Sequence, residues 1–296
     1  MSRLIHVMLI LIVVVLLSMC AVPGNAAERP DKNGILLVSF GTSMPEATVA
    51  IDSLVNAVKE AFPDTEVRVA YTSNIIRRKL KREQNIEIPT PPEALAKMND
   101  DGFTHVCVQP THIIPGEEFD DLKGVVDAFA SLEGKYGFKH LAIGRPFLSE
   151  SKDSEVMAGI LNRWFEKKAK DTRAVVLMGH GSPHMANAMY SELQLALSRV
   201  ADYFFIGTVE APPTFEHVLN ALEKTGYKTV ILSPFMIVAG DHANNDLADA
   251  DDPESWLSQL IEQGFEVETE LVGLGEYPEI VQLFVERVHD LMGEIN

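Results

Sequence analysis

The chain has 296 residues, and 46% of them are hydrophobic, which is enough apolar material for one or two globular domains. It carries 25 basic and 43 acidic residues, and the resulting net charge of −18 excludes general binding to nucleic acid, whose phosphates repel such a surface. With two cysteines in the whole chain, a disulfide-rich scaffold is also excluded.

The N-terminus has the pattern of a secretory signal. Arg3 precedes the apolar stretch Leu4–Met19, and small residues follow at Ala26–Ala27. We therefore expect cleavage of residues 1–27 and a periplasmic protein, with membrane contact only through an uncleaved signal. A permanent anchor is the alternative, but the stretch is shorter than the ~20 residues that a spanning helix needs. Cys20 raises a lipoprotein as a further alternative, although the residue before it is larger than such sites usually carry.

From residue 34 onward, short β-branched runs alternate with amphipathic helical stretches. This alternation predicts parallel sheets covered by helices on both faces. The expected strands are Gly34–Phe40, Glu66–Tyr71, Thr104–Gln109, His140–Gly144, Ala174–Met178, Tyr203–Gly207, Thr229–Ser233 and Val267–Leu271. The expected helices include Glu46–Ala61, Phe119–Leu132, Ser154–Lys168, Met185–Val200, Phe215–Lys224 and Tyr277–Met292.

The two halves of the chain resemble each other. "GILLVSFGTS" (34–43) matches "AVVLMGHGSP" (174–183), and "THVCVQPTHIIPGEE" (104–118) matches "KTVILSPFMIVAGDH" (228–242). Such similarity indicates a duplication and predicts two similar α/β lobes, 28–150 and 151–296, with the active site in the cleft between them. The alignment places Phe40 over His180 and Glu118 over His242, so only the second half carries histidine at both positions.

Three expected strand ends in the second half lead into polar residues, namely His180, Glu210 and His242. In a parallel sheet these ends lie side by side at one edge. Two imidazoles and a carboxylate suit a divalent first-row ion such as Co²⁺, Ni²⁺, Fe²⁺ or Zn²⁺ and leave coordination positions open. Each residue alone also has a structural explanation, since strand-end histidines are commonly structural and Glu210 is placed near Pro212 at a helix start. The shared topology is what favours a metal site.

These motifs together resemble the class II chelatases, and specifically the anaerobic-type sirohydrochlorin cobaltochelatases in an exported form. The segments that carry the resemblance are "LLVSFGTS", "AYTSNIIRRKL", "PTHIIPGEEFD", "LMGHGSPH", "GTVEAPPT" and "PFMIVAGDHANNDLA". The resemblance covers nearly all of residues 34–294. It implies insertion of a divalent metal ion, most plainly Co²⁺ and otherwise Fe²⁺ or Ni²⁺, into the tetrapyrrole sirohydrochlorin. It also implies that the metal ligands are His180, Glu210 and His242. The signal sequence departs from this pattern, because cobalamin synthesis is a cytoplasmic pathway.

Metal insertion requires loss of two ring protons. His180 is expected to accept one, because a neutral imidazole takes up a proton near neutral pH, and Glu118 is expected to accept or relay protons from the opposite lobe. The expected substrate contacts are hydroxyl groups just past strand ends and cations of "RRKLKR", which suit a ring rimmed by carboxylates. They are Thr42, Ser43, Thr72, Ser73, Arg77 and Arg78. The metal is expected as substrate, with no organic cofactor.

The main alternative is a periplasmic metal- or tetrapyrrole-binding or transport protein without catalysis, which the export signal favours. Repeated turnover separates the two, because a binding protein stops at one equivalent. A hydrolase built on Ser182 is a weaker alternative, because the serine lacks the strand-to-helix elbow of that class. The sequence leaves open whether the protein is a homo-oligomer.

Overall fold

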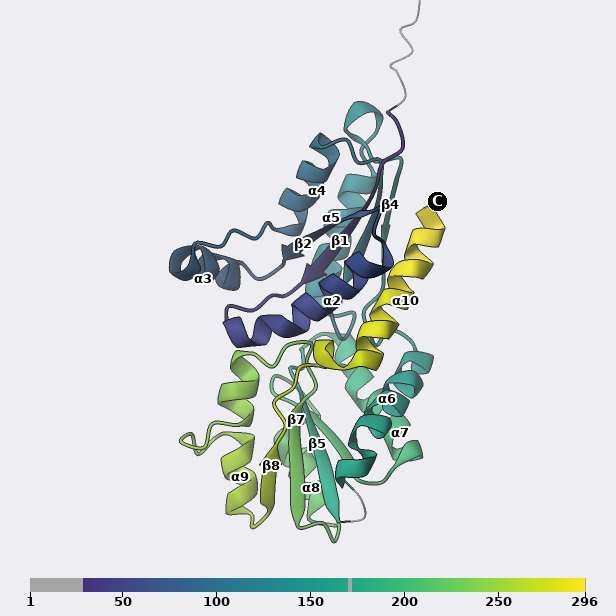
Figure 1. Ribbon diagram of the computed structural model, residues 1–296. Helices are drawn as coiled ribbons and strands as arrows, with labels where there is room; N and C mark the ends of the chain where they lie inside the picture. Colours follow the sequence, from purple (N-terminus) through teal and green to yellow (C-terminus); the bar gives the residue numbers. More distant parts are fainter. Residues whose placement is uncertain (1–28, 170–171, 296) are drawn as a thin grey trace, which may run out of the picture. The chain divides into compact units, whose positions relative to one another are not determined.

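Two four-stranded parallel sheets form the framework of the structure, a computed structural model that describes residues 29–169 and 172–295 (Figure 1). The strand orders are β2-β1-β3-β4 and β6-β5-β7-β8, so the two sheets repeat one topology. The predicted fold of two similar parallel α/β lobes is confirmed. The first sheet consists of β1 (Asn33–Ser39), β2 (Glu66–Tyr71), β3 (His105–Pro110) and β4 (His140–Ile143). The second consists of β5 (Arg173–Gly179), β6 (Phe204–Thr208), β7 (Thr229–Pro234) and β8 (Glu266–Thr269).

The central strands read as unbroken apolar runs because both of their faces are covered. In β1, Ile35 and Leu37 point into one core while Leu36 and Val38 point into another. The run "AVVLM" of β5 alternates between two cores in the same way. This double burial explains why the strand positions were readable from the sequence.

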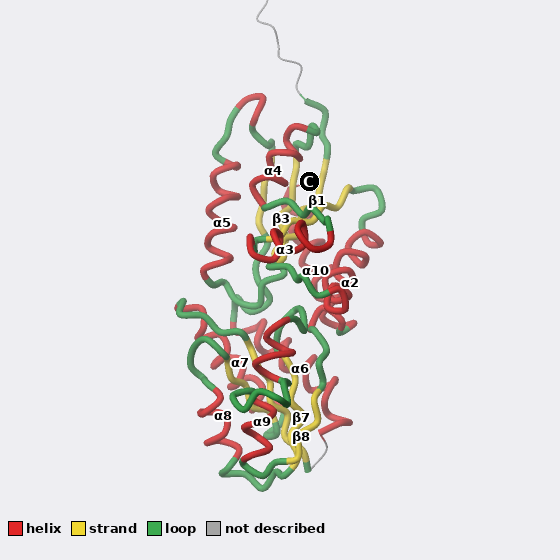
Figure 2. Tube along the Cα trace, turned by 90° about the vertical axis from the view of Figure 1, so that its left-hand side faces the viewer, coloured by secondary structure: helices red, strands yellow, loops and turns green. Residues whose placement is uncertain are grey.

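Helices cover each sheet on both faces (Figures 1 and 2). On the first sheet, α4 and α5 pack on one face and α2 and α10 on the other. On the second sheet, α6 and α7 pack on one face and α8 and α9 on the other. The bounds are α2 (Thr48–Ala61), α3 (Asn74–Gln84), α4 (Pro91–Asp100), α5 (Glu117–Ala130), α6 (Ser151–Ala169), α7 (Ala188–Val200), α8 (Phe215–Leu222), α9 (Trp256–Glu262) and α10 (Pro278–Ile295). Short 3₁₀ turns are η1 (Pro45–Ala47), η2 (Gly134–Tyr136), η3 (Met185–Asn187) and η5 (Leu274–Glu276), and η4 (Ala243–Leu247) is a π-helical turn.

Of the helices that are not among the expected ranges, α4 and α9 have clear local causes. Thr90 and Glu93 form a capping box at the start of α4, with proline in its first turn. The Ser255 hydroxyl accepts a hydrogen bond from the Ser258 amide at the start of α9. None of the helices in residues 29–169 and 172–295 is long and apolar enough to cross a membrane. The predicted signal over residues 1–27 lies outside the described residues.

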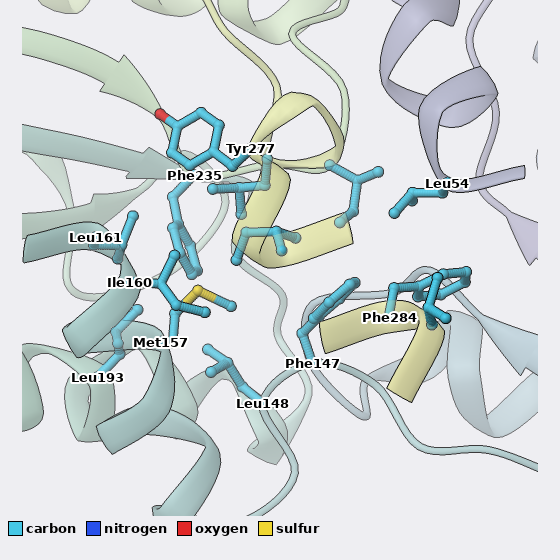
Figure 3. Close-up of a cluster of buried hydrophobic side chains, with 14 of the residues drawn as sticks. Leu54, Phe147, Leu148, Met157, Ile160, Leu161, Leu193, Phe235, Tyr277 and Phe284 are labelled. Atoms are coloured by element: carbon cyan, nitrogen blue, oxygen red, sulfur yellow. The ribbon is translucent and has the colours of Figure 1, made fainter. Parts of the chain in front are cut away.

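One hydrophobic core runs through both sheets, so residues 32–296 form a single compact unit. The segment 144–150 between β4 and α6 is called the connector. Figure 3 shows side chains of this core from α2 (Leu54), the connector (Phe147), α6 (Met157), the residue after β7 (Phe235) and α10 (Phe284). Burial of the Cys107 thiol in the same core raises its pKa to about 12, so this free cysteine behaves as a small apolar side chain. The predicted lobe boundary near residue 150 stays a prediction.

The last helix crosses back to the first sheet. α10 follows β8 of the second sheet in sequence, yet it packs on β3, β4 and α2. The preceding turn η5 also contacts α2, and a Cβ on Gly275 would lie 2.5 Å from the carbonyl oxygen of Ala50. A side chain at position 275 would therefore push these two elements apart.

A buried ion pair fixes this crossing. The Arg287 guanidinium of α10 donates to Asp153 Oδ1 of α6 at 2.9 Å and to the Phe147 carbonyl at 2.9 Å, and it also donates to the Pro146 carbonyl. Burial lowers the pKa of Arg287, and the charge of Asp153 opposes that shift. The pair joins the helix of one sheet, the helix of the other and the connector between them.

The second oxygen of Asp153 organises the connector itself. Oδ2 accepts the backbone amides of Ser149 and Glu150, both at 3.0 Å, and a bond from the Arg145 guanidinium. Both oxygens of the buried Asp153 carboxylate thus accept hydrogen bonds, which is the condition under which such a charge is tolerated.

Replacing Asp153 by Ala should lower the free energy of unfolding by about 3–5 kcal/mol, because the Arg287 charge would stay buried without its partner. Urea unfolding of the purified protein measures this. The matched control is Arg199→Ala, which breaks the exposed pair with Glu155 and should change stability by about 0.5 kcal/mol or less. Equal stability of the two variants would show that the buried pair does not hold the crossing.

Candidate metal and substrate site

Two histidines meet at the carboxyl edge of the second sheet. His180 follows β5 and His242 lies beyond the end of β7, and these two strands are neighbours on either side of the point where strand order reverses. Ligands of open α/β sheets bind at such a point. The ring centroids are 4.7 Å apart and the ring planes meet at 87°. The structure thus brings together the two imidazoles that the sequence analysis paired.

The His180 ring is oriented by its own turn. Nδ1 lies 2.8 Å from the Gly181 carbonyl oxygen, so Nδ1 carries the proton and Nε2 keeps its lone pair. Gly181 has φ 83°, and a Cβ there would lie 2.6 Å from Thr208 Oγ1. Glycine is required at this position by both the left-handed backbone and the close approach of β6. The "GHG" motif therefore leaves one nitrogen, Nε2, of the exposed His180 imidazole available to a ligand.

His242 is oriented by a carboxylate that the sequence analysis missed. Its Nδ1 is hydrogen-bonded to Asp246 Oδ2, four residues later across the π-helical turn η4. A carboxylate on one ring nitrogen fixes the tautomer and makes the other nitrogen a better metal ligand. The i, i+4 spacing of "HANND" was a signal for this pair, because such residues lie on one face of a helical turn. Single π-helical turns are frequent at functional sites.

A backbone hydrogen bond joins Glu210 to His180. Its amide donates to the His180 carbonyl oxygen at 2.9 Å, while its side chain is exposed. In residues 29–169 and 172–295, no group of three or more histidine, cysteine, aspartate or glutamate side chains is close enough to hold a metal ion. The structure therefore supplies the two imidazoles as a pair, with the Glu210 carboxylate on the adjacent loop rather than among them.

Strand-end loops of the first sheet come close to those of the second. A Cβ on Gly116 would lie 3.8 Å from Ser182 Oγ, and one on Gly240 would lie 3.8 Å from Thr42 Oγ1. Asp120 Oδ2, which follows β3 of the first sheet, lies 3.3 Å from His184 Nε2, which follows β5 of the second sheet. The two side chains form an ion pair when the imidazole is charged. Glu118, the predicted proton relay, is exposed in the first turn of α5, between Gly116 and Asp120.

The turns after β1 and β5 have the same construction, as the internal repeat predicts. Gly41 has φ 98° where the second sheet has Gly181. The Thr42 hydroxyl accepts the amide of Met44 at 3.1 Å, and the Ser182 hydroxyl accepts the amide of His184 at 3.1 Å. Phe40 is thus the structural counterpart of His180.

Buried neutral groups lie behind both turns. A Cβ on Gly41 would lie 2.4 Å from the Tyr71 ring, and one on Gly179 would lie 2.4 Å from the Tyr190 ring. Burial raises the pKa of each tyrosine to about 12, so neither carries charge at neutral pH. Burial also lowers the pKa of His112, in the loop after β3, to about 4. The two tyrosine rings therefore pack against the glycines of these turns as uncharged groups.

The four hydroxyl groups predicted to bind the substrate differ in hydrogen bonding. Thr42 and Ser43 are buried in the turn after β1, and Ser73 caps α3 through the Ile76 amide. Thr72 Oγ1 is buried with no hydrogen-bond partner among the described residues.

The two predicted arginine contacts, Arg77 and Arg78, also differ in exposure and hydrogen bonding. Arg77 donates to the Ile88 carbonyl at 2.6 Å, to Asn74 at 3.0 Å and to Glu93 at 2.7 Å, so it joins α3 to α4 and to the segment before α4. Arg78 is exposed on α3. Of the two arginines, Arg78 has the freer access to a ligand.

Solved structures share this duplicated architecture. SirB from Bacillus subtilis with Fe³⁺ has a TM-score of 0.59 at 16% identity, covering 90% of this chain and 99% of that one. CbiX, described as the terminal enzyme for biosynthesis of siroheme in denitrifying bacteria, has a TM-score of 0.54 at 17% identity, covering 87% and 98%. The two parallel sheets are therefore those of a two-lobed α/β chelatase fold.

Sequence comparison narrows the class. A family model described as cobalt chelatase (CbiK) matches residues 33–293. Sirohydrochlorin cobaltochelatase CbiKC of Nitratidesulfovibrio vulgaris Hildenborough is 37% identical over 257 residues, which cover 87% of this chain and 89% of that protein. Sirohydrochlorin cobaltochelatase of Salmonella typhimurium LT2 is 34% identical over 262 residues, covering 88% and 97%. The chain belongs to the cobalt chelatase (CbiK) family. The expected resemblance and the expectation of an enzyme are confirmed, and a binding protein without catalysis is not favoured.

Asp246→Ala should weaken Co²⁺ binding by about 10–100-fold, because His242 would lose the carboxylate that fixes its ring. Calorimetric titration of the purified protein with Co²⁺ measures the change. Asp251→Ala is the matched control, since it removes an exposed carboxylate five residues further along the same loop. If both variants bind Co²⁺ equally well, Asp246 acts only through its charge or not at all.

Proposed function

We propose that this protein inserts Co²⁺ into sirohydrochlorin, with His180 and His242 as the pair that delivers the ion. The observation that carries the proposal is the 4.7 Å approach of the two rings at the edge where sheets of this topology bind ligands. Membership in the cobalt chelatase family supports insertion of Co²⁺ as the reaction. Two relatives that are named sirohydrochlorin cobaltochelatases support sirohydrochlorin as the substrate.

The ion binds first through the Nε2 atoms of His180 and His242, because the Nδ1 atoms of both are already bonded to protein oxygens. Glu210 adds a carboxylate after a rotation of its exposed side chain. Two or three protein ligands leave coordination positions of a first-row ion open for ring nitrogens. Holding ion and ring together removes much of the entropic barrier to their reaction.

Insertion releases two protons from the ring for each divalent ion. As each ring nitrogen binds the ion, an imidazole ligand leaves it and regains a free lone pair. His180 Nε2 then accepts one proton, and Glu118 accepts or relays the other toward solvent. Charge balances, because one doubly charged ion enters the ring as two protons leave.

Ligand chemistry also bears on the choice of metal and on the binding of the ring's carboxylates. Fe²⁺ and Ni²⁺ suit the same ligands, so availability in the compartment selects among metals. The exposed Arg78 binds the carboxylate rim of the ring, with Arg77 aligning α3 behind it. Rim contacts from the hydroxyls of Thr42, Ser43, Thr72 and Ser73 stay a prediction from the sequence, because these hydroxyls lie within the turns and the helix start.

His180→Ala should lower the rate of Co²⁺ insertion by at least about 100-fold, because one side chain supplies both a ligand and a proton acceptor. His242→Ala removes a ligand alone, so excess Co²⁺ should rescue it better. The measurement is the change in the absorption spectrum of sirohydrochlorin over many turnovers. His140→Ala, at an exposed histidine in β4, is the control and should keep full activity. Near-normal turnover by His180→Ala, or equal rescue of the two variants, would remove this division of roles.

We also infer that the protein is exported with cleavage near residue 27. The composition of residues 1–27 supports this, and Arg3 is the one charged residue among them. Expression in a Gram-negative host, followed by fractionation and mass determination, is the test. A periplasmic protein beginning near Glu28 is the expected result. An intact chain in the cytoplasm would contradict export, and lipid on Cys20 would replace cleavage at residue 27 by a lipoprotein.

A further inference from the structure

Large apolar side chains are exposed around the carboxyl edges of both sheets. Among the large hydrophobic side chains that the structure describes, the two most exposed are Met185 at 84% and Ile75 at 79%. Met185 begins η3 in the turn after His180, and Ile75 lies in the first turn of α3, just beyond β2. Phe40, directly after β1, is 47% exposed. Exposed apolar side chains of this size are costly in a free protein and indicate a ligand surface when they gather.

Phe40 has the most informative position of the three. The duplicated turn places it where the second sheet has His180, and the left-handed Gly41 and Gly181 repeat the same backbone. The Phe40 carbonyl accepts the Ser73 amide at 3.3 Å, so the start of α3, with Ile75, is fixed beside it. One half of the molecule thus presents an imidazole and the other half presents an aromatic ring from equivalent positions.

The loop of Phe40 also contacts the loop of His242. Asn244 Nδ2 lies 3.8 Å from Met44 Sδ, and Gly240 approaches Thr42. Because Phe40 and His242 lie on contacting loops, a ligand held by the histidine pair lies within reach of the Phe40 loop. A phenyl ring offers no lone pair to a metal ion, and its face suits contact with an apolar, flat part of a ligand.

We infer that Phe40 is a positioning residue whose ring packs on the face of the tetrapyrrole macrocycle and holds it over the His180–His242 pair. This inference rests on the proposed function and adds the apolar half of substrate recognition. The conjugated macrocycle has two apolar faces and a charged rim, and stacked rings attract one another beyond the area they bury. The duplicated site is then divided, with the metal held from the second sheet and the ring from the first.

The test separates ring binding from metal binding. Purified wild type, Phe40→Ala and Phe40→Tyr are titrated with metal-free sirohydrochlorin by fluorescence quenching and, separately, with Co²⁺ by calorimetry. Leu132→Ala is the matched control, because Leu132 is 45% exposed just after the end of α5. Urea unfolding confirms that each variant is folded.

Phe40→Ala should weaken sirohydrochlorin binding about 10-fold and leave Co²⁺ binding unchanged, while Phe40→Tyr and Leu132→Ala should stay within about 2-fold of wild type. In steady state, KM for sirohydrochlorin should rise more than kcat falls. Equal ring binding by Phe40→Ala and Leu132→Ala would overturn the inference and leave the proposed function intact. An equal loss of Co²⁺ binding in Phe40→Ala would overturn it too, since Phe40 would then support the metal loop. A wild type that does not bind sirohydrochlorin would overturn the proposed function, and this inference with it.

Discussion

The ion pair between Arg287 and Asp153 is the constraint on which the rest of this structure depends. It is buried, and it joins α10, α6 and the connector that carries the chain from one sheet to the other. A buried arginine is tolerated only where most of its donors are met, and here carbonyl groups of the connector and one carboxylate accept bonds from both terminal nitrogens, while Nε has no partner among the described residues. Because α10 returns from the second sheet to the first, this pair closes the chain around both sheets. The hydrophobic core is shared by both sheets.

That closed body fixes the approach of the strand-end loops. Loops after β1 and β3 reach those after β5 and β7, as the approach of Gly116 to Ser182 and of Gly240 to Thr42 shows. Neither sheet alone presents this set of groups. The proposed chemistry needs an ion from one side and a ring from the other, so the packing far from the site is what makes the site usable.

Duplication followed by divergence explains the asymmetry of the two edges. The turns after β1 and β5 keep a left-handed glycine and a hydroxyl that accepts an amide two residues on. These features set the backbone, so they remain the same in both halves. The residue before the glycine projects from the turn without altering it, and there Phe40 and His180 differ. A change of function at this position therefore required no change of fold.

The sequence by itself determined the eight strands, most of the helices, the repeat and the pairing of His180 with His242. Strands buried on both faces are continuous apolar runs, and polar residues past their ends must meet at one edge. Only the tertiary structure decided that α10 packs on the first sheet, because a helix's apolar face does not specify which sheet covers it. It also decided that Asp246 orients His242, that Arg77 is held by Ile88, Asn74 and Glu93, and that the Glu210 side chain lies outside the histidine pair. Side-chain direction and partner choice depend on contacts between distant segments, and those contacts exist only once the two sheets have packed together.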